Sequence, residues 1–159
     1  MNLFKTYVRS ILECNTCTWS PHLKTDIHLV ESVQRNFTRR VCQRSNIRFS
    51  SYNDRLKALN LESLHCRRVK RDLVLMYQIF HNHIDIAFSS FFIKRALGGH
   101  NLQRHNQQIS RKSAPKTLIR DNFFTFRVIK YWNKLPQSVV DSPSIDSFTN
   151  RLRRIDINI

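Results

Sequence analysis

The stretch FFTFRVIKYWNKLPQSVVDSPSIDSF, residues 123–148, decides the fold of this chain. Its first ten residues contain three phenylalanines, a tyrosine and a tryptophan, and the aromatic run ends before Leu135 and Pro136. Aromatic side chains carry a large apolar surface, and no other segment could bury as much of it. We therefore expect residues 123–148 to close a hydrophobic core that the preceding segments assemble.

Those preceding segments have the spacing of amphipathic helices. Apolar residues recur every three or four positions, which predicts helices over 3–13, 21–41, 51–59 and 63–81. The same spacing predicts two more helices that overlap the core stretch, over 121–135 and 145–155. The expected N-terminal caps are Ser20 before Pro21, Ser51 with Asp54, Asp121 or Asn122, and Ser144. The expected apolar faces of the first two helices are Leu3, Tyr7, Val8, Ile11 and Leu12, then Leu23, Ile27, Val30, Phe37 and Val41.

The predicted fold is mainly α. We expect a small helical bundle over 1–97, a basic loop or short hairpin over 98–120, and a C-terminal aromatic helical region over 121–159. The two glycines of the chain, Gly98 and Gly99, are adjacent and mark the break. The pattern does not assign the secondary structure of residues 84–97, whereas residues 100–118 are polar and indicate a loop or an edge strand.

The charge points to a polyanion as partner. The chain has 27 Lys and Arg against 11 Asp and Glu, which gives a formal net charge of +16 over 159 residues. Lysines and arginines that neutralise phosphates release condensed counterions, so RNA and DNA are the expected partners. An anionic membrane surface is the weaker alternative. Lys5 and Arg9 interrupt the first apolar stretch, so we expect no signal peptide, no membrane span and an intracellular protein.

The sequence offers little for catalysis or for metal binding. Cys14 and Cys17 form a CxxC motif, and a zinc site with nearby His and Cys residues is conceivable, but a second close pair at finger spacing is missing. We expect reduced thiols, no cofactor and no small-molecule substrate. The histidines His81 and His83 are expected to be surface or capping groups, and the common phosphate-binding and nucleophile motifs are absent.

Basic side chains beside aromatic ones remain as candidates for a binding surface. Any single Lys or Arg could simply keep a helix face soluble, but the total charge exceeds what solubility requires. Phe91 and Tyr131 are candidate stacking platforms for bases. The candidate phosphate contacts are Arg35, Arg39, Arg67, Lys70, Arg71, Arg111, Lys112 and Arg127.

Four blocks of the chain follow the sequence patterns of one protein family. Residues 3–22 are similar to its "LYKTYVRPILEY…VWSPH", and residues 29–39 to its "LExVQRxFTR". Residues 52–72 are similar to "YxxRLxxLxLxxLxxRRxxxD". The most specific block, residues 123–152, is similar to "FFxxRVxxxWNxLPxxVVxxxSxxxFxxxL". By these blocks nearly the whole chain resembles the C-terminal end of the reverse transcriptase of jockey-type non-LTR retrotransposons (LINE elements).

The resemblance implies a helical thumb over 1–97, followed by a C-terminal region, that together hold a template–primer duplex such as an RNA–DNA hybrid. Ser10 replaces the proline of the family, and residues 14–18 depart from its "YCSPV". The family's catalytic aspartates lie in a YxDD palm motif, which this sequence lacks. We therefore expect a non-catalytic fragment of a 5′-truncated copy that would normally pack on a palm. The alternatives are the tail of a complete RNA-directed DNA polymerase and an inert structural or interaction relic.

Overall fold

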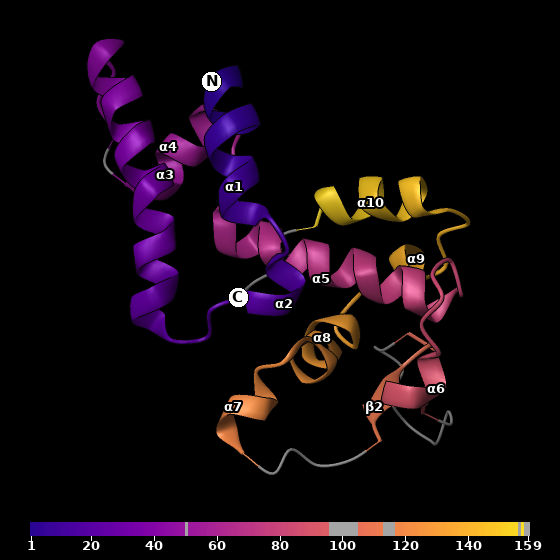
Figure 1. Cartoon of the computed structure of the whole chain (residues 1–159). Helices are drawn as coiled ribbons and strands as arrows, with labels where there is room; N and C mark the ends of the chain where they lie inside the picture. The colour runs from indigo at the N-terminus through magenta and orange to yellow at the C-terminus, as the bar shows by residue number, and fades with distance from the viewer. Residues whose placement is uncertain (50, 96–104, 113–116, 156, 158–159) are drawn as a thin grey trace. The chain divides into compact units, whose positions relative to one another are not determined.

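The protein is mainly helical, which confirms the predicted fold class (Figure 1). The structure, a computed structural model, describes residues 1–49, 51–95, 105–112, 117–155 and 157. The predicted break at Gly98 and Gly99 lies outside these residues. The elements are η1 (Phe4–Val8), α1 (Arg9–Glu13), α2 (Thr16–Trp19), α3 (Lys24–Arg44), α4 (Tyr52–Ala58), α5 (Leu64–Phe80), α6 (Phe88–Phe91), β1 (Phe92–Lys94), β2 (Ile109–Arg111), α7 (Leu118–Asp121), α8 (Phe124–Trp132), α9 (Gln137–Val140) and α10 (Ile145–Arg153).

The chain forms two compact units, residues 1–68 (unit 1) and residues 69–159 (unit 2). The boundary falls inside α5, whereas the sequence predicted the first region to end at residue 97. The physical reason is the apolar face of α5 after residue 68. Met76 and Tyr77 belong to the same buried cluster as Trp132 and Phe148. The aromatic stretch therefore organises a core with the second part of α5.

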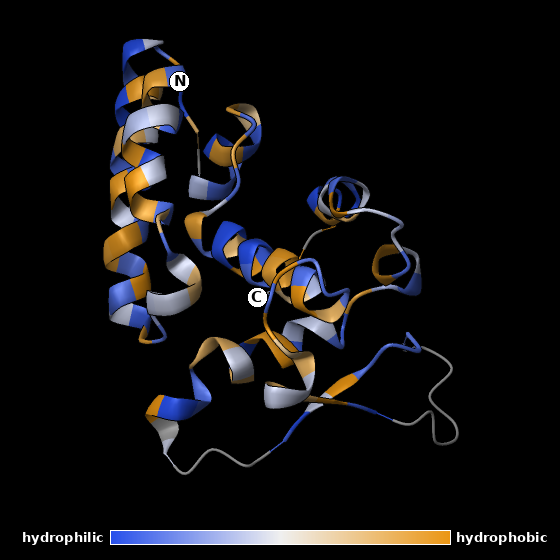
Figure 2. Ribbon diagram, turned by 45° about the vertical axis from the view of Figure 1, so that its right-hand side comes forward, coloured by the Kyte–Doolittle hydropathy of each residue, from blue (hydrophilic) through white to orange (hydrophobic). Residues whose placement is uncertain are grey.

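The buried face of α3 in unit 1 is polar, which corrects the expected apolar face. Glu31, Gln34 and Thr38 are buried, together with Cys42. Leu23 is exposed, and the other four residues of the expected face are only partly buried. Figure 2 shows hydrophilic and hydrophobic residues interspersed along α3. Partners distant in sequence, described below, make this polar face the buried one.

The N-terminal helical segment also presents its expected apolar face to solvent. Leu3, Tyr7 and Ile11 are 74%, 64% and 74% exposed, so the residues of unit 1 do not cover them. The side of this segment that packs carries Phe4, whose ring stacks on that of Phe37 with centroids 4.1 Å apart. The helical period of the segment is thus as predicted, but the apolar face that it defines has no partner within the unit.

Unit 2 has a continuous hydrophobic core. Trp132, Val128 and Phe148 are fully buried, and the ring of Tyr77 stacks on that of Phe148 at a centroid distance of 4.4 Å. The Tyr77 hydroxyl donates to the Ser142 carbonyl oxygen at 2.5 Å, so its polar end is also satisfied. The buried residues of this core are Val69, Leu73, Met76, Tyr77, Ile79, Phe92, Ile109, Val128, Trp132, Leu135, Val139, Val140, Phe148 and Leu152.

A two-stranded antiparallel hairpin packs on α8. Its strand β2 lies in the segment 100–118, which was predicted to be loop or edge strand, and β1 lies in the segment 84–97, whose secondary structure the sequence did not assign. Phe92 pairs with Arg111 and Lys94 with Ile109. The Asn133 side chain accepts from the Ile109 N–H at 3.0 Å and donates to the Ile109 carbonyl oxygen at 2.8 Å, so one amide side chain satisfies both backbone groups. The Trp132 indole N–H donates to the Gln107 carbonyl oxygen at 2.9 Å. The Trp–Asn pair thus fixes the hairpin.

Two of the predicted helix caps are confirmed. The Ser51 hydroxyl accepts from the Asp54 N–H at 3.1 Å, and the Ser144 hydroxyl accepts from the Ser147 N–H at 3.2 Å. The cap predicted at Ser20 is wrong, because Ser20 ends α2 and α3 begins at Lys24.

The cap predicted at Asp121 or Asn122 is also wrong. Both residues lie at the C-terminal end of α7, and Phe123 precedes α8 without a side-chain cap. In the described part of the chain we find no helix with the length and apolar character that crossing a bilayer requires.

Candidate nucleic-acid interface

The second half of α3 carries a row of exposed arginines. Residues 35–48 contain five arginines and no acidic residue. Four of these arginines lie on α3 itself, and all four are exposed. Positions four residues apart on a helix lie on the same side, so they form two pairs, 35 with 39 and 40 with 44. We call this set the α3 arginine face: Arg35, Arg39, Arg40 and Arg44.

A buried hydrogen-bond network holds α3 in place behind this face. The Glu31 carboxylate accepts from the Tyr52 hydroxyl at 2.6 Å and from the backbone N–H groups of Leu64 and His65 at 3.1 and 3.3 Å. The last two are unpaired donors at the start of α5, where a carboxylate is favourable. The Gln34 amide donates to the Tyr52 hydroxyl at 3.1 Å. Burial, and then the bond to Glu31, raise the pKa of Tyr52, so its hydroxyl stays a donor at neutral pH.

The Tyr52 ring also orders one member of the arginine face. The guanidinium carbon of Arg35 lies 4.8 Å from the centroid of the ring, and that of Arg55 lies 5.5 Å from it. A guanidinium that stacks on an aromatic face keeps its N–H groups in its own plane, where they remain able to donate to an anion. Arg35 is therefore preorganised while it stays exposed.

Arg67 binds a carboxylate inside unit 1. Its Nη2 donates to Glu13 Oε2 at 2.9 Å, and its Nε donates to Glu13 Oε1, which makes a two-pronged ion pair. Glu13 is only 2% exposed, and the hydrogen bond to it raises the pKa of Arg67. The pair uses the guanidinium edge that a phosphate would need. Arg67 thus contributes to the fold of unit 1.

In unit 2, Lys70 and Arg127 are likewise engaged within the protein. Arg127 donates to both oxygens of Asp72, at 2.7 and 3.1 Å, and to the Asn122 carbonyl oxygen at 3.0 Å. Lys70 is 8% exposed, and its Nζ donates to a backbone carbonyl oxygen of α10 at 3.3 Å. Arg71, next to Lys70 on α5, is exposed.

The strand β2 contributes a second basic surface, in unit 2. Arg111 is 48% exposed, and its Nη1 lies 3.2 Å from Oδ1 of Asp121, which is 50% exposed. Ion pairs as exposed as this one are weak, so a phosphate can replace the carboxylate at little cost. The exposed Lys112 follows it, with its Nζ donating to the Ser89 carbonyl oxygen at 3.3 Å.

The eight candidates thus separate into two groups. Arg35 and Arg39 lie together on α3, Arg111 and Lys112 are neighbours on the hairpin, and these four residues and Arg71 are exposed. Arg67, Lys70 and Arg127 bind inside their own units. The candidate list missed Arg40 and Arg44. The signal that could have found them is the run of five arginines without an acidic residue over 35–48.

The described residues include no group of three or more His, Cys, Asp or Glu side chains placed to hold a metal ion. The four cysteines are free thiols. Of the two candidate stacking residues, Phe91 is 47% exposed on α6 and Tyr131 is partly buried on α8. Burial raises the pKa of Tyr131, with a smaller contribution from the charge of Asp72.

Comparison with known proteins gives a partial likeness. No protein-family model matches the chain, and no solved structure matches it. The uncharacterized protein B0403.1 of Caenorhabditis elegans is 32% identical to this chain over 80 residues. Those residues are 50% of this chain and 38% of that protein, so the match spans well under half of the relative.

Proposed function

We propose that this chain binds the phosphate backbone of nucleic acids through the α3 arginine face, with a smaller contribution from Arg111 and Lys112. The observation that carries the proposal is the set of four exposed arginines on one helix without an acidic residue among them. Like charges four residues apart repel each other by a few tenths of a kcal/mol, and a bound polyanion removes that repulsion.

The dimensions of the α3 arginine face suit a phosphate backbone. Arg35 and Arg44 are nine positions apart, roughly 14 Å along the axis of α3 at 1.5 Å per residue and about two and a half helical turns, so they point to opposite sides of the helix. A phosphate backbone that crosses the exposed side of α3 therefore meets the pair 35 and 39 on one flank and the pair 40 and 44 on the other, with a phosphate about every 3.4 Å along each strand of a duplex. The buried network around Glu31 holds α3 in place, so the main chain of the helix needs little further ordering when a nucleic acid binds.

The resemblance to the thumb of non-LTR retrotransposon reverse transcriptases supports the same function. A thumb grips a template–primer duplex without taking part in nucleotide addition, so an RNA–DNA hybrid is the ligand that we propose. Phosphate contacts carry no sequence information, and the binding should therefore be insensitive to sequence. In this role the chain is a non-catalytic holder of the duplex.

The test is fluorescence anisotropy of a labelled 20-base-pair RNA–DNA hybrid with the full chain, between 50 and 200 mM salt. With six or more phosphate contacts, the affinity should fall by about three decades over this range. The variant Arg39→Gln/Arg40→Gln should lower the steepness of log affinity against log salt by up to about 2. The reason is that each phosphate contact that is lost reduces the number of counterions released on binding.

The matched control is Arg153→Gln/Arg154→Gln, which removes the same charge from two adjacent exposed arginines at the end of α10. We expect this variant to keep nearly the full slope. Equal losses in the two variants would mean that net charge alone governs binding. Absence of binding at 50 mM salt, or an affinity independent of salt, would refute the proposed function.

A further inference from the structure

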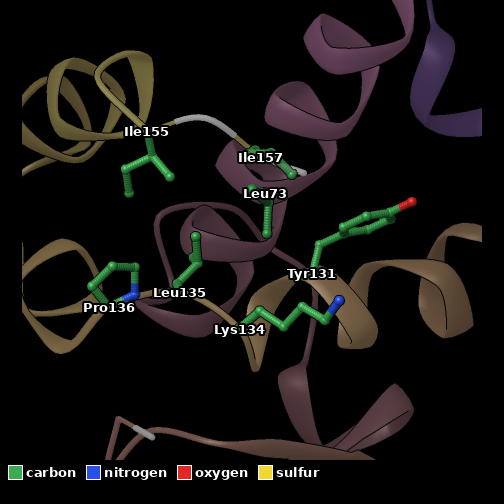
Figure 3. Close-up of a pocket in the computed structure, with 7 residues that line it drawn as sticks. All are labelled: Leu73, Tyr131, Lys134, Leu135, Pro136, Ile155 and Ile157. Carbon is green, nitrogen blue, oxygen red and sulfur yellow. The ribbon is translucent and has the colours of Figure 1, made fainter. Parts of the chain in front are cut away.

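Unit 2 contains an apolar pocket at the end of α8. Its walls come from α5, from the turn that follows α8 and from the C-terminal segment, and they are formed by Leu73, Leu135, Pro136, Ile155 and Ile157 (Figure 3). Leu73 and Leu135 belong to the buried core, so the floor of the pocket is part of the folded structure of the unit. The pocket therefore exists before any ligand binds.

The size of the pocket limits the ligand. Its volume is about 210 Å³. An apolar cavity of about 150 Å³ is known to hold one benzene molecule, so this pocket accommodates one planar ring system and little more. A long acyl chain does not fit in this space, whereas a nucleobase does.

The polar groups of the pocket lie together. In Figure 3 the Tyr131 hydroxyl and the Lys134 Nζ are on the same side of the pocket, and the aliphatic residues Pro136 and Ile155 are on the other. Lys134 is exposed, and Tyr131 is partly buried. A ring that enters between the aliphatic walls thus has the ring of Tyr131 beside it and an ammonium group at the rim, whereas the Tyr131 hydroxyl points away from the other lining side chains (Figure 3).

The pocket has a cation at its rim. Lys134 lines the pocket and is exposed, and four residues earlier the Nζ of Lys130 lies 5.9 Å from the centroid of the Tyr131 ring. Among the residues that the structure describes, the lining contains no acidic residue. The nearby carboxylate of Asp72 is bound by Arg127. One ammonium group at the rim of a slot for one ring matches the phosphate and the base of a single nucleotide.

We propose that this pocket takes one unpaired base of a bound single strand, with Lys134 contacting the adjoining phosphate. The inference rests on the proposed function and adds to it a base-dependent contribution, which a face of arginines cannot supply. We expect the pocket to accept any base that fits its volume. Its aliphatic and aromatic walls contact the faces of a base and do not form hydrogen bonds that distinguish one base from another.

The experiment compares two labelled 12-mers of equal charge, oligo(dT) and a fully abasic strand, binding to the full chain at 50 mM salt. The wild type should bind oligo(dT) more tightly by roughly 5- to 150-fold, the range that one stacked base contributes. The variant Ile155→Trp fills the pocket and should bring this ratio close to one while the affinity for the abasic strand is unchanged. The matched control Ile11→Trp, at a residue 74% exposed in unit 1, should keep the wild-type ratio.

The outcomes separate the pocket from the proposed function. If both 12-mers bind equally well to the wild type, or if Ile155→Trp retains the ratio, the pocket does not bind a base although phosphate binding stands. If neither 12-mer binds while the RNA–DNA hybrid does, the inference fails and the proposed function stands; if the hybrid does not bind either, the proposed function fails as well.

A second measurement avoids any dependence on how Ile155→Trp folds. In methyl NMR spectra of the wild type, thymidine 5′-monophosphate should shift the signals of Leu73, Leu135 and Ile155, whereas inorganic phosphate at the same concentration should not. Unchanged methyl signals at millimolar thymidine 5′-monophosphate would overturn the inference.

Discussion

The two units of this chain are held together in different ways. In unit 1 the buried side of the longest helix is polar, and Glu31 links it to Tyr52 and to the start of α5. In unit 2 the core is built from apolar and aromatic side chains instead, and Trp132 and Phe148 are fully buried. Hydrogen bonds lose their energy when the geometry changes, so the packing of α3 in unit 1 depends on the directions of a few polar groups. Unit 1 also carries the larger arginine face.

The difference also explains where apolar surface remains. Unit 2 gathers many of its large apolar side chains into one cluster, although Ile119 and Phe123 are 68% and 53% exposed. Unit 1 leaves Leu3, Tyr7 and Ile11 exposed along its N-terminal segment, and Leu29 is 71% exposed on α3. Contiguous exposed apolar patches usually indicate an interaction surface or a tendency to aggregate.

The largest effect that we predict comes from breaking the aromatic core. Trp132→Ala removes a fully buried ring and its hydrogen bond to the Gln107 carbonyl oxygen. The loss of the buried surface and the cavity left behind should lower the free energy of unfolding by about 3–5 kcal/mol. Urea denaturation followed by circular dichroism measures this change.

The matched control is Phe123→Ala, because Phe123 lies in the same aromatic stretch but is 53% exposed. We expect this variant to change the free energy of unfolding by no more than about 0.5 kcal/mol. Similar losses in the two variants would show that the aromatic stretch does not act through a packed core.

A smaller effect should follow from breaking the polar network of unit 1. Glu31→Gln places an amide where a carboxylate oxygen accepts a hydrogen bond, so a buried donor at the start of α5 loses its partner. We expect a cost of about 1–3 kcal/mol in urea denaturation, and faster hydrogen exchange at the amides of Leu64 and His65.

The comparison variant is Tyr52→Phe, which deletes the hydroxyl that donates to Glu31 and accepts from Gln34 and leaves the bonds of Glu31 to α5 intact. Its cost should be about 1 kcal/mol, and the exchange of the two amides should stay as in the wild type. Exchange that is equally fast in both variants would contradict the role given to Glu31.

The helix caps allow a direct comparison of local structure in the two units. Ser51 caps α4 in unit 1 and Ser144 caps α10 in unit 2, with nearly equal distances of 3.1 and 3.2 Å. Ser51→Ala and Ser144→Ala should each cost about 1 kcal/mol in thermal or urea unfolding, and the corresponding glycine variants only a few tenths. A cost for one cap more than twice that of the other would mean that local structure also differs between the units.

These caps show which parts of the fold the sequence can predict. A cap depends on residues three apart, and the helical period depends on residues three or four apart, so Ser51, Ser144 and the limits of α5 could be predicted locally. The polar face of α3 could not, because the partners of Glu31 lie 21 to 34 residues further along the chain. A pattern of apolar residues does not reveal such distant partners.

The same limit applies to the candidate interface. The sequence identified basic residues as a class but could not separate exposed from engaged ones. Arg67 and Arg127 are bound by carboxylates 54 and 55 residues away, whereas Arg35 and Arg39 face solvent. Only the fold brings Glu13 and Asp72 to these guanidinium groups. A local signal was nevertheless present for the α3 arginine face, since a run of arginines without an acidic residue leaves few partners close in sequence.

The smallest effect that we expect is a change in the pH dependence of stability that comes from His105 in unit 2. His105 is 2% exposed, its Nε2 lies 2.9 Å from the Trp132 carbonyl oxygen, and its Nδ1 accepts from the Gln107 N–H at 3.2 Å. These partners require the neutral ring with its proton on Nε2, and burial lowers the pKa of His105 below its ordinary value of 6.5. The unfolded chain therefore binds a proton more readily than the folded one.

The stability that His105 contributes should be fully present above about pH 6.5 and should be lost as the pH falls from there toward the lowered pKa of the folded state. Burial lowers the pKa of His65 and His81 as well, so the wild type alone would not isolate this residue. The measurement is the urea midpoint at pH 7.5, 6.5 and 5.5 for the wild type and for His105→Gln, which keeps a donor for the Trp132 carbonyl oxygen. The variant should lose less stability than the wild type on acidification, and parallel curves would mean that His105 takes up its proton without disturbing the aromatic core.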